Sequence, residues 1–502
     1  MSIFGTLTVG KQGLLAQARA IQTSSNNIAN VNTPGYTRQR PVFVPVAPSF
    51  ARGGVSLGGG VELADIQRLT NAALDAQLQR ERQELAFQER LDQGLARIET
   101  TLQELEETGI TATLARFFAD LNDLASNPSE ASSRNQVIQS ATSLADLIRD
   151  ADRRLAQLQV DANQQLVQIT NEINAVAADI AQINRQIQQQ EVGGRATASS
   201  LRDEREQLLT ELGKKIDFTS FERDDGQIGV FVAGGFLLVD QDFAARLTVS
   251  GDQSSQPLAD PSFFHIFQDA DGSIAGPITS GITGGQLGAT LELRDTRFQF
   301  YRNSLDELAF TLANRLNTQH LAGYGLEDDT QRRLFVDPTQ PADPQGPDFT
   351  SVAGAASVIR VNADIVANIR HLAGGGTSLG VGLGAAASDN VNARALAGLQ
   401  SSSTAFFRVG DPVAGPATGT QQTLGESMDS LAGTLGAEIQ STRRALVQEG
   451  LVVANLEEQR GAISGVSLDE EVTNLIRFER AYQASARVIE VANNLLEQLL
   501  SI

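Results

Sequence analysis

The chain has 502 residues, of which 41% are hydrophobic, and its formal net charge is -21. This length and apolar content suffice for several buried cores, and about three or four domains are expected. Such an acidic surface repels the phosphates of nucleic acids and of anionic lipids. We therefore expect neither a nucleic-acid partner nor a membrane partner.

The sequence contains no cysteine, which excludes disulfides, thiolate metal ligands and thiol nucleophiles. No apolar run approaches the roughly 18 residues that a membrane-spanning helix needs. The opening Met-Ser-Ile-Phe-Gly lacks the basic stretch and the following apolar stretch of a Sec-type signal peptide. We therefore expect either a cytoplasmic protein or one that is exported by a route without such a peptide.

Near the start of the chain an apolar row repeats every seven residues, at Leu7, Leu14, Ile21 and Ile28. Because the residues between them are mostly polar or small, the row predicts the apolar face of an amphipathic helix. Pro34 and Gly35 end this helix, since proline cannot continue it and the pair suits the centre of a type II turn. Residues 36–46 alternate in polarity and include two prolines, which predicts an edge strand or an extended arm.

The middle of the chain changes character twice. Residues 70–108 predict a long helix, and residues 155–187 keep apolar steps of three or four, which is coiled-coil spacing. Residues 216–283 are rich in strand formers and turn signals and predict a β-rich insert. A helical pattern returns over residues 285–321, whereas residues 324–388 are rich in Gly, Pro and Asp and predict a mixed, variable insert.

The end of the chain carries a second apolar row, which includes Leu475, Tyr482, Ile489 and Leu496. Two further helical patterns precede it, over residues 390–399 and 424–456. Neither terminal helix can bury its row alone. The two helices either pack against each other as an ordinary core hairpin, or pair into a coiled coil that also contacts neighbouring subunits; an apolar row by itself favours the first interpretation.

The predicted fold is mainly α with a β insert, in nested and discontinuous domains. The terminal helices form a coiled coil, and long helices form a bundle-like body. The expected units are a terminal coiled-coil assembly domain (1–60 with 464–502), a helical body (61–215 with 284–323 and 389–463), the β-rich insert (216–283) and the variable mixed insert (324–388).

Both chain ends resemble one protein family. Residues 26–36, Asn-Asn-Ile-Ala-Asn-Val-Asn-Thr-Pro-Gly-Tyr, resemble the N-terminal signature of the rod, hook and hook-associated axial proteins of the bacterial flagellum. Residues 464–476, Ser-Gly-Val-Ser-Leu-Asp-Glu-Glu-Val-Thr-Asn-Leu-Ile, resemble their C-terminal signature. The matching signature positions are Asn27, Asn30, Asn32, Pro34, Gly35, Tyr36, Leu468 and Glu471. A fit at both ends in the right order is more specific than either segment alone.

Further segments resemble the hook-associated members more than the hook or rod subunits. They are Thr37-Arg38-Gln39 after the turn and the sequence Ser-Gly-Val-Ser-Leu-Asp-Glu-Glu at residues 464–471. Inside the chain, residues 202–205 and residues 317–323 are also similar to that group. The resemblance is patchy over the helical body and absent from the two inserts.

The resemblance implies a structural subunit that leaves the cell through the flagellum's own export channel and joins hook to filament as a ring of subunits. The implied partners are further copies of the chain, the hook protein, the second junction protein on the filament side, and a cytoplasmic export chaperone on the C-terminal helix. We expect the assembly interface at Leu7, Leu14, Ile21, Ile28, Leu475, Tyr482, Ile489 and Leu496. Zero cysteine suits passage through a channel unfolded, and terminal helices that order only against partners avoid premature polymerisation.

Two alternatives stay open. A hook or rod axial subunit shares the terminal signatures, although the long helical body argues against it because those relatives carry mainly β domains. An exported adhesin or secreted enzyme with flagellar-type ends would carry its binding face or active site in residues 216–283 or 324–388.

We predict no catalytic, cofactor-binding or metal site. Residues 5–11 spell the start of a phosphate-binding loop, but Gln12 stands where a Ser or Thr hydroxyl is needed. The only histidines, His265, His320 and His371, lack metal-ligand spacing; His320 is expected to be structural, near a helix end where it suits the last carbonyls. Residues 269–272 resemble half a calcium loop and are interpreted as a turn.

Overall fold

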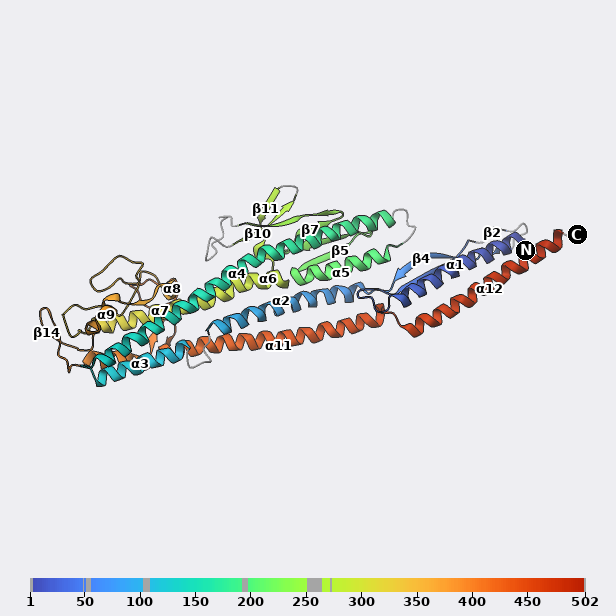
Figure 1. The fold of residues 1–502 in the computed structure, drawn as a ribbon. Coiled ribbons are helices and arrows are strands. Elements are labelled where there is room, and N and C mark those ends of the chain that lie inside the picture. The colour runs from blue at the N-terminus through green and yellow to red at the C-terminus, as the bar shows by residue number, and fades with distance from the viewer. Residues whose placement is uncertain are drawn as a thin grey trace.

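The computed structural model describes residues 3–47, 49–50, 56–102, 109–191, 197–250, 264–270 and 273–500. Long helices run roughly along one axis and give the molecule an extended shape, with the two chain ends together at one tip (Figure 1). The fold is mainly α with a β insert, as the sequence predicts.

The two terminal helices, α1 (Ile3–Ala29) and α12 (Leu468–Leu500), pack side by side and run in opposite directions (Figure 1). Beside them lies an antiparallel pair of strands, β1 (Gln39–Pro45) and β4 (Val61–Arg68), in which Gln39 pairs with Arg68. The short strands β2 (Ser49–Phe50) and β3 (Ser56–Leu57) also pair. The extended arm predicted after the Pro-Gly turn is therefore β1.

The body is built on one very long helix, α4, which has 61 residues (Ala131–Glu191). The sequence pattern predicts only its second half. The first half packs against α3 and α7 in one hydrophobic core, and the second half packs against α5 and the β insert in another. The other helices of the body are α2 (Ala72–Leu102), α3 (Ile110–Ser126), α5 (Ser199–Lys215), α6 (Gly285–Glu292), the π-helical segment η2 (Leu293–Arg297), α7 (Phe298–Leu321), α10 (Val391–Gly398) and α11 (Leu424–Ser464).

The β-rich insert lies along α4 and α5 on one side of the body (Figure 1). Its two sheets are antiparallel, with strand orders β5-β6-β7-β8 and β11-β10-β9. Asp271 and Gly272 of the rejected calcium loop lie outside the described residues. The strands are β5 (Phe218–Glu222), β6 (Ile228–Val232), β7 (Phe236–Asp240), β8 (Phe243–Ala244), β9 (Arg246–Ser250), β10 (His265–Ala270) and β11 (Ser273–Pro277), followed by the 3-10 turn η1 (Thr279–Gly281).

The mixed insert covers the tip of the body farthest from the chain ends (Figure 1). It has little regular structure, yet Phe335, Ile359 and Ile365 are fully buried in the core that α3, α4 and α7 share. Its short elements, with those that follow α10, are β12 (Phe335–Val336), α8 (Ala355–Val358), β13 (Arg360–Val361), α9 (Ala363–Ala367), η3 (Ile369–His371), β14 (Ser378–Gly380), β15 (Leu383–Ala385), η4 (Leu399–Ser401), β16 (Thr404–Ala405) and β17 (Gln421–Gln422).

His320 of α7 hydrogen-bonds the mixed insert. Its side chain is fully buried, its Nδ1–H donates to the Arg332 carbonyl at 2.6 Å, and its Nε2 accepts from the Ala373 amide at 2.9 Å. The sequence predicted that His320 bonds the last carbonyls of its helix, but both ring nitrogens instead bond backbone groups of the mixed insert. Since Nε2 is occupied as an acceptor, the ring is neutral, and burial lowers its pKa from 6.5 to about 4.

Acidification is therefore expected to destabilise the body through His320. A histidine whose pKa is depressed in the folded state stabilises the fold above pH 6.5, and this contribution is lost as the pH falls from there to about 4. The shift corresponds to about 3 kcal/mol. Denaturant unfolding of wild type and His320→Gln at pH 7 and pH 4.5 should show a smaller pH dependence in the variant.

Asp306 acts in the opposite direction, because burial raises its pKa to about 6 and its contribution is lost as the pH rises. Asp306 is present in both the wild type and the His320→Gln variant, so the difference in pH dependence between these two proteins is due to His320. Equal pH dependence in the two proteins would contradict the neutral, buried histidine.

Candidate assembly site: the terminal helix pair and its joint

The buried side of α1 consists of small residues. Its members are Gly10, Gly13, Ala16, Ala20, Thr23, Ser24 and Asn27. A Cβ added to Gly10 would lie 2.8 Å from Ile489 Cγ1, and one added to Gly13 would lie 2.9 Å from Ser485 Oγ. Both separations are shorter than van der Waals contact, so α1 and α12 approach more closely here than larger side chains would permit.

The eight residues predicted for the assembly interface are all half-buried. Ile489 lies in the seam, against Gly10. Leu14 directly follows the buried Gly13, and at about 100° per residue it lies beside the seam rather than in it; Leu7, Ile21 and Ile28 share its side of the helix. The sequence row therefore flanks the contact between the helices, and the seam itself was missed because small residues give no hydrophobic signal.

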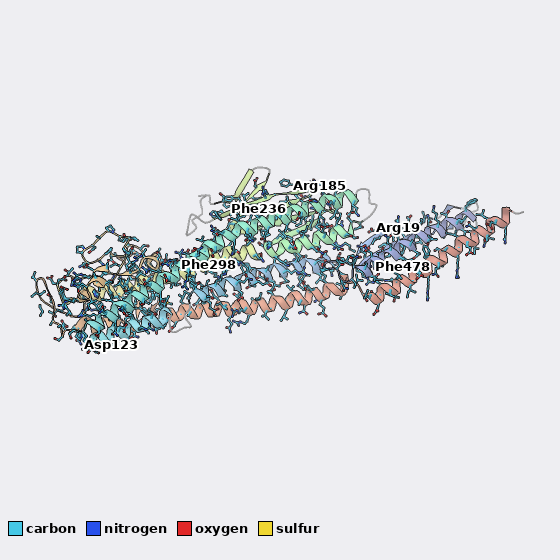
Figure 2. The ribbon with its side chains drawn as sticks, viewed as in Figure 1. Arg19, Asp123, Arg185, Phe236, Phe298 and Phe478 are labelled. Atoms are coloured by element: carbon cyan, nitrogen blue, oxygen red, sulfur yellow. The ribbon has the colours of Figure 1, made fainter. Side chains whose placement is uncertain are left out.

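Large apolar side chains also point away from the pair. On α1 the most exposed of these are Phe4 and Leu15, which are 70% and 53% exposed. On α12 they are Leu468, Val472, Ile476, Val491 and Leu495, each between 44% and 57% exposed. Figure 2 shows side chains of α12 standing out on the side away from α1. The pair thus buries one side of each helix and leaves apolar surface on the other.

Asn27 is the polar centre of the pair. It is completely buried, and its Nδ2 donates to the Gln39 carbonyl at 2.8 Å and to Glu471 Oε2 at 3.1 Å. Its Oδ1 accepts from the Tyr36 hydroxyl at 2.8 Å and from the Gln39 amide at 3.0 Å. All four hydrogen-bonding positions of the amide are therefore used. Burial, together with the charges of Asp203 and Glu471, raises the pKa of Tyr36 to about 12.

Arg38 ties this centre to the start of α12. Its Nε donates to Glu471 Oε1 at 2.8 Å, its Nη1 donates to Glu470 Oε2 at 2.6 Å, and its backbone amide donates to the Ser464 carbonyl at 2.9 Å. Ser464 is the last residue of α11, so Arg38 holds the first strand beside the break between α11 and α12. Phe43 of β1 meets Phe478 of α12 edge to face at 6.1 Å between ring centres.

The remaining signature residues shape the turn after α1. Gly35 has φ +79°, and the Tyr36 amide donates to the Thr33 carbonyl, as expected for a Pro-Gly type II turn. Asn30 Nδ2 donates to the Asn26 carbonyl at 2.9 Å, and the Pro34 carbonyl accepts from Gln207 at 2.7 Å. Asn32, Pro34 and Leu468 are exposed. The structure thus brings Asn27, Tyr36 and Glu471 into one network and leaves Asn32 and Leu468 at the surface.

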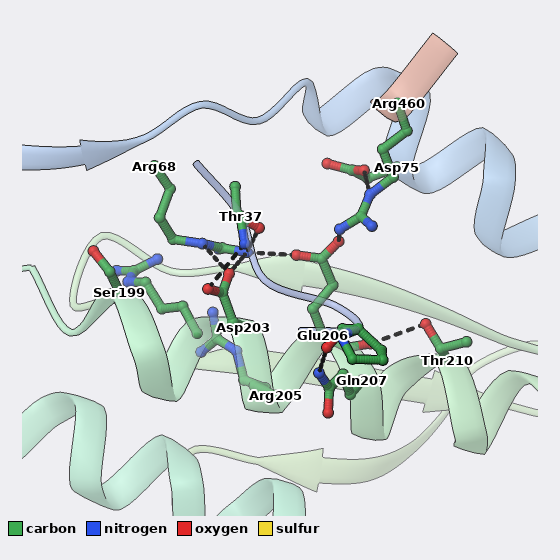
Figure 3. A network of polar contacts seen from close by, with 12 residues as sticks. Thr37, Arg68, Asp75, Ser199, Asp203, Arg205, Glu206, Gln207, Thr210 and Arg460 are labelled. Atoms are coloured by element: carbon green, nitrogen blue, oxygen red, sulfur yellow. Dashed lines mark hydrogen bonds and ion pairs between the residues drawn. The ribbon is translucent and has the colours of Figure 1, made fainter. Parts of the chain in front are cut away.

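A network of ion pairs joins the terminal pair to the body (Figure 3). Arg68 of β4 pairs with Asp203 at 2.7 Å and with Glu206 at 2.6 Å, both on α5. Glu206 also pairs with Arg460 of α11, which contacts Asp75 of α2 at 2.9 Å. Residues 202–205 drew attention in the sequence only through their resemblance to the family. In the structure, Asp203 from this segment accepts a hydrogen bond from the Thr37 amide at 3.2 Å. Burial raises the pKa of Asp203, against the effect of Arg68.

Within the described residues, no three or more His, Asp or Glu side chains are grouped so that they would hold a metal ion. Over the same part of the chain, no helix is both long enough and apolar enough to cross a membrane. The arrangement at the chain ends is that of two closely packed helices joined to the body by ion pairs.

The sequence matches the models of three protein families. The helical domain of flagellar hook-associated protein FlgK matches residues 95–335. The C-terminal region of flagellar basal body rod FlgEFG proteins matches residues 459–502, and the flagella basal body rod protein family matches residues 7–37. The last two matches fall on the terminal helices, and the first falls on the body and the β insert.

Curated relatives match over the whole length. Flagellar hook-associated protein 1 of Bacillus subtilis is 25% identical over 531 residues, covering 100% of this chain and 98% of the relative. The proteins of the same name from Salmonella typhimurium and Escherichia coli are each 26% identical, with 98% of both chains covered. The solved structure of the flagellar hook junction protein FlgK from Burkholderia pseudomallei has a TM-score of 0.59 and 15% identity, covering 78% of this chain and 100% of that one. At that identity the structural likeness concerns the fold alone.

Proposed function

Because the chain belongs to the family of flagellar hook-associated protein 1, we propose that it joins hook to filament by polymerising through its terminal helix pair. It is a structural subunit of the flagellar hook–filament junction, exported through the flagellar system. The observation that carries the proposal is the terminal pair itself. Signature residues from both chain ends, Asn27, Tyr36 and Glu471, build it, and it still exposes apolar surface.

The proposed assembly interface comprises the eight half-buried residues of the two sequence rows and the exposed apolar residues beside them. Covering a large apolar side chain contributes about 1.5–3 kcal/mol when its burial is complete, so half-buried residues contribute a fraction of that each. Repeated around a ring of subunits, such contributions outweigh the cost of ordering the helices. Copies of the chain are therefore the first partners.

The other partners follow from position in the flagellum. In this proposal the hook protein contacts one side of the ring and the second junction protein contacts the filament side. Before export, a cytoplasmic chaperone covers the exposed apolar residues of α12, such as Val472 and Ile476. We expect deletion of residues 467–502 to abolish copurification of that chaperone, and unchanged copurification would contradict its placement on α12.

The function is tested in a strain that lacks the gene. We expect hooks without filaments in electron micrographs, and filaments restored by the wild-type gene. A labelled copy of the protein should appear as a short band at the far end of the hook. Filaments that attach normally without the protein, or label spread along the whole hook, would contradict a junction subunit.

A further inference from the structure

A β-hairpin at the tip farthest from the chain ends exposes three aliphatic side chains (Figure 1). This apolar hairpin, residues 378–385, consists of β14 and β15 and turns at residues 381 and 382. Leu379 is 66% exposed, Val381 is 98% exposed and Leu383 is 53% exposed. Exposed apolar side chains are unremarkable when they are scattered singly, whereas a group of them points to an interaction site.

The base of the apolar hairpin is held against the body, and its turn projects. The Ala385 amide donates to the Gly325 carbonyl at 2.7 Å. A Cβ added to Gly384 would lie 2.4 Å from the carbonyl carbon of Leu326, so backbone lies directly against backbone there. The three aliphatic side chains therefore lie between these contacts and the free turn.

The aliphatic side chains surround the end of the hairpin instead of sharing one face. Gly380 pairs with Leu383 across the two strands. Paired residues of an antiparallel hairpin point to the same side, and successive residues point to opposite sides. Leu379, which precedes Gly380, therefore points away from the side of Leu383, and Val381 lies at the turn. A protein surface would cover one of these sides, whereas a lipid phase would surround both.

The apolar hairpin also lacks charges and free polar side chains. Residues 372–388 contain no Asp, Glu, Lys or Arg, although 20% of the whole chain is charged. The one polar side chain of residues 378–385 is Ser378, whose hydroxyl donates to the Leu383 carbonyl at 2.6 Å. Specific protein interfaces carry about one hydrogen bond per 100–200 Å². This hairpin offers no uncommitted side chain for such bonds, which again favours a lipid over a protein partner.

We propose that the apolar hairpin inserts shallowly into the surface of a zwitterionic lipid bilayer, with Val381 deepest. The net charge of -21 repels an anionic surface, whereas an uncharged hairpin needs no charged lipid to bind. Such a contact lies in the interface and does not cross the bilayer. It goes beyond the proposed function, because the hairpin and the terminal pair lie at opposite tips of the molecule (Figure 1).

Flotation of the purified full-length protein with phosphatidylcholine vesicles tests the proposal. We expect Val381→Asp to lower the floating fraction by about tenfold, because a carboxylate resists leaving water. Val381 is almost fully exposed, so the substitution leaves the fold intact. Val447→Asp is the matched control, since Val447 is 64% exposed but lies on α11, outside the hairpin. Its floating fraction should stay within about twofold of wild type.

The absence of cysteine from the sequence permits a second measurement on single-cysteine variants. The emission of an environment-sensitive fluorophore on Val381→Cys should shift to the blue when phosphatidylcholine vesicles are added. The same fluorophore on Val447→Cys should show no shift. Vesicles that also contain phosphatidylglycerol should bind less protein, because their negative charge repels the acidic chain.

Wild-type protein that does not float, or that floats no more than Val381→Asp, would overturn the lipid contact. Stronger flotation with the anionic vesicles would also overturn it, because the contact would then depend on basic side chains. Wild-type protein that ignores vesicles but self-associates in analytical ultracentrifugation, where Val381→Asp does not, would assign the hairpin to a protein contact instead. The junction function stands or falls separately, by the deletion strain.

Discussion

Replacing Ile489 with aspartate is expected to leave hooks without filaments while the helical body stays folded. Ile489 lies against Gly10 in the seam of the terminal pair, where a carboxylate would replace an apolar contact with α1. Because Ile489 is half-buried, losing its apolar contact costs a fraction of the about 1.5–3 kcal/mol of complete burial, and partly desolvating the new charge adds to that cost. Since neither helix is stable alone, the pair opens. Motility and filament counts in the complemented deletion strain measure the loss.

Leu14→Asp is expected to act in the same direction from α1. Asn494→Asp is the matched control, because it adds the same charge to an exposed side of α12 and should restore motility. Circular dichroism should show that the body of the Ile489→Asp variant unfolds at nearly the wild-type temperature, since α4 and its two cores do not contact the seam. Normal motility with Ile489→Asp would show that the seam is not needed for assembly.

Replacing Asn27 with leucine is expected to release the terminal pair from its strand and turn. The leucine fills a similar volume but removes four hydrogen bonds, those to the Gln39 amide and carbonyl, to the Tyr36 hydroxyl and to Glu471, which keeps its bond from Arg38. Each buried polar group left without a partner costs about 1–3 kcal/mol, so the expected loss is on the order of 5 kcal/mol. Limited proteolysis should then cut near the α11–α12 break much faster than in wild type.

Asn32→Leu is the control for this change, because Asn32 is an exposed asparagine of the same turn. It should leave the cleavage rate within about twofold of wild type, as surface substitutions usually change stability by less than ~0.5 kcal/mol. Equal cleavage of the Asn27→Leu and Asn32→Leu variants would show that the Asn27 network does not hold the joint.

The ion pairs at the joint explain how the terminal pair and the body act together. Glu206 binds Arg68 of the terminal unit and Arg460 of α11 at once, so one carboxylate bridges both (Figure 3). Asp203 is buried, whereas Arg68, Glu206 and Arg460 are partly exposed, so solvent screens the pair between Glu206 and Arg460 more than the pair between Arg68 and Asp203.

Local patterns in the sequence predicted the second half of α4 and the β insert. The apolar steps over residues 155–187 and the strand formers over residues 216–283 each record the side of an element that is buried, whatever buries it. The turn at Pro34 and Gly35 was also readable, because it depends on backbone conformation alone. The terminal signatures identified the family before any contact between them was visible.

Contacts between distant segments were decided only by the tertiary structure. The seam of α1 consists of small residues because α12 lies so close, and no periodic apolar pattern marks it. Asn27 looks like any polar helix residue until Glu471, from the other end of the chain, supplies its partner. Residues 324–388 lack periodicity because their buried side chains, such as Phe335, Ile359 and Ile365, come from short irregular elements that pack into the core of the body. Sequence periodicity records how much of an element is covered, whereas the identity of the covering residues follows from packing.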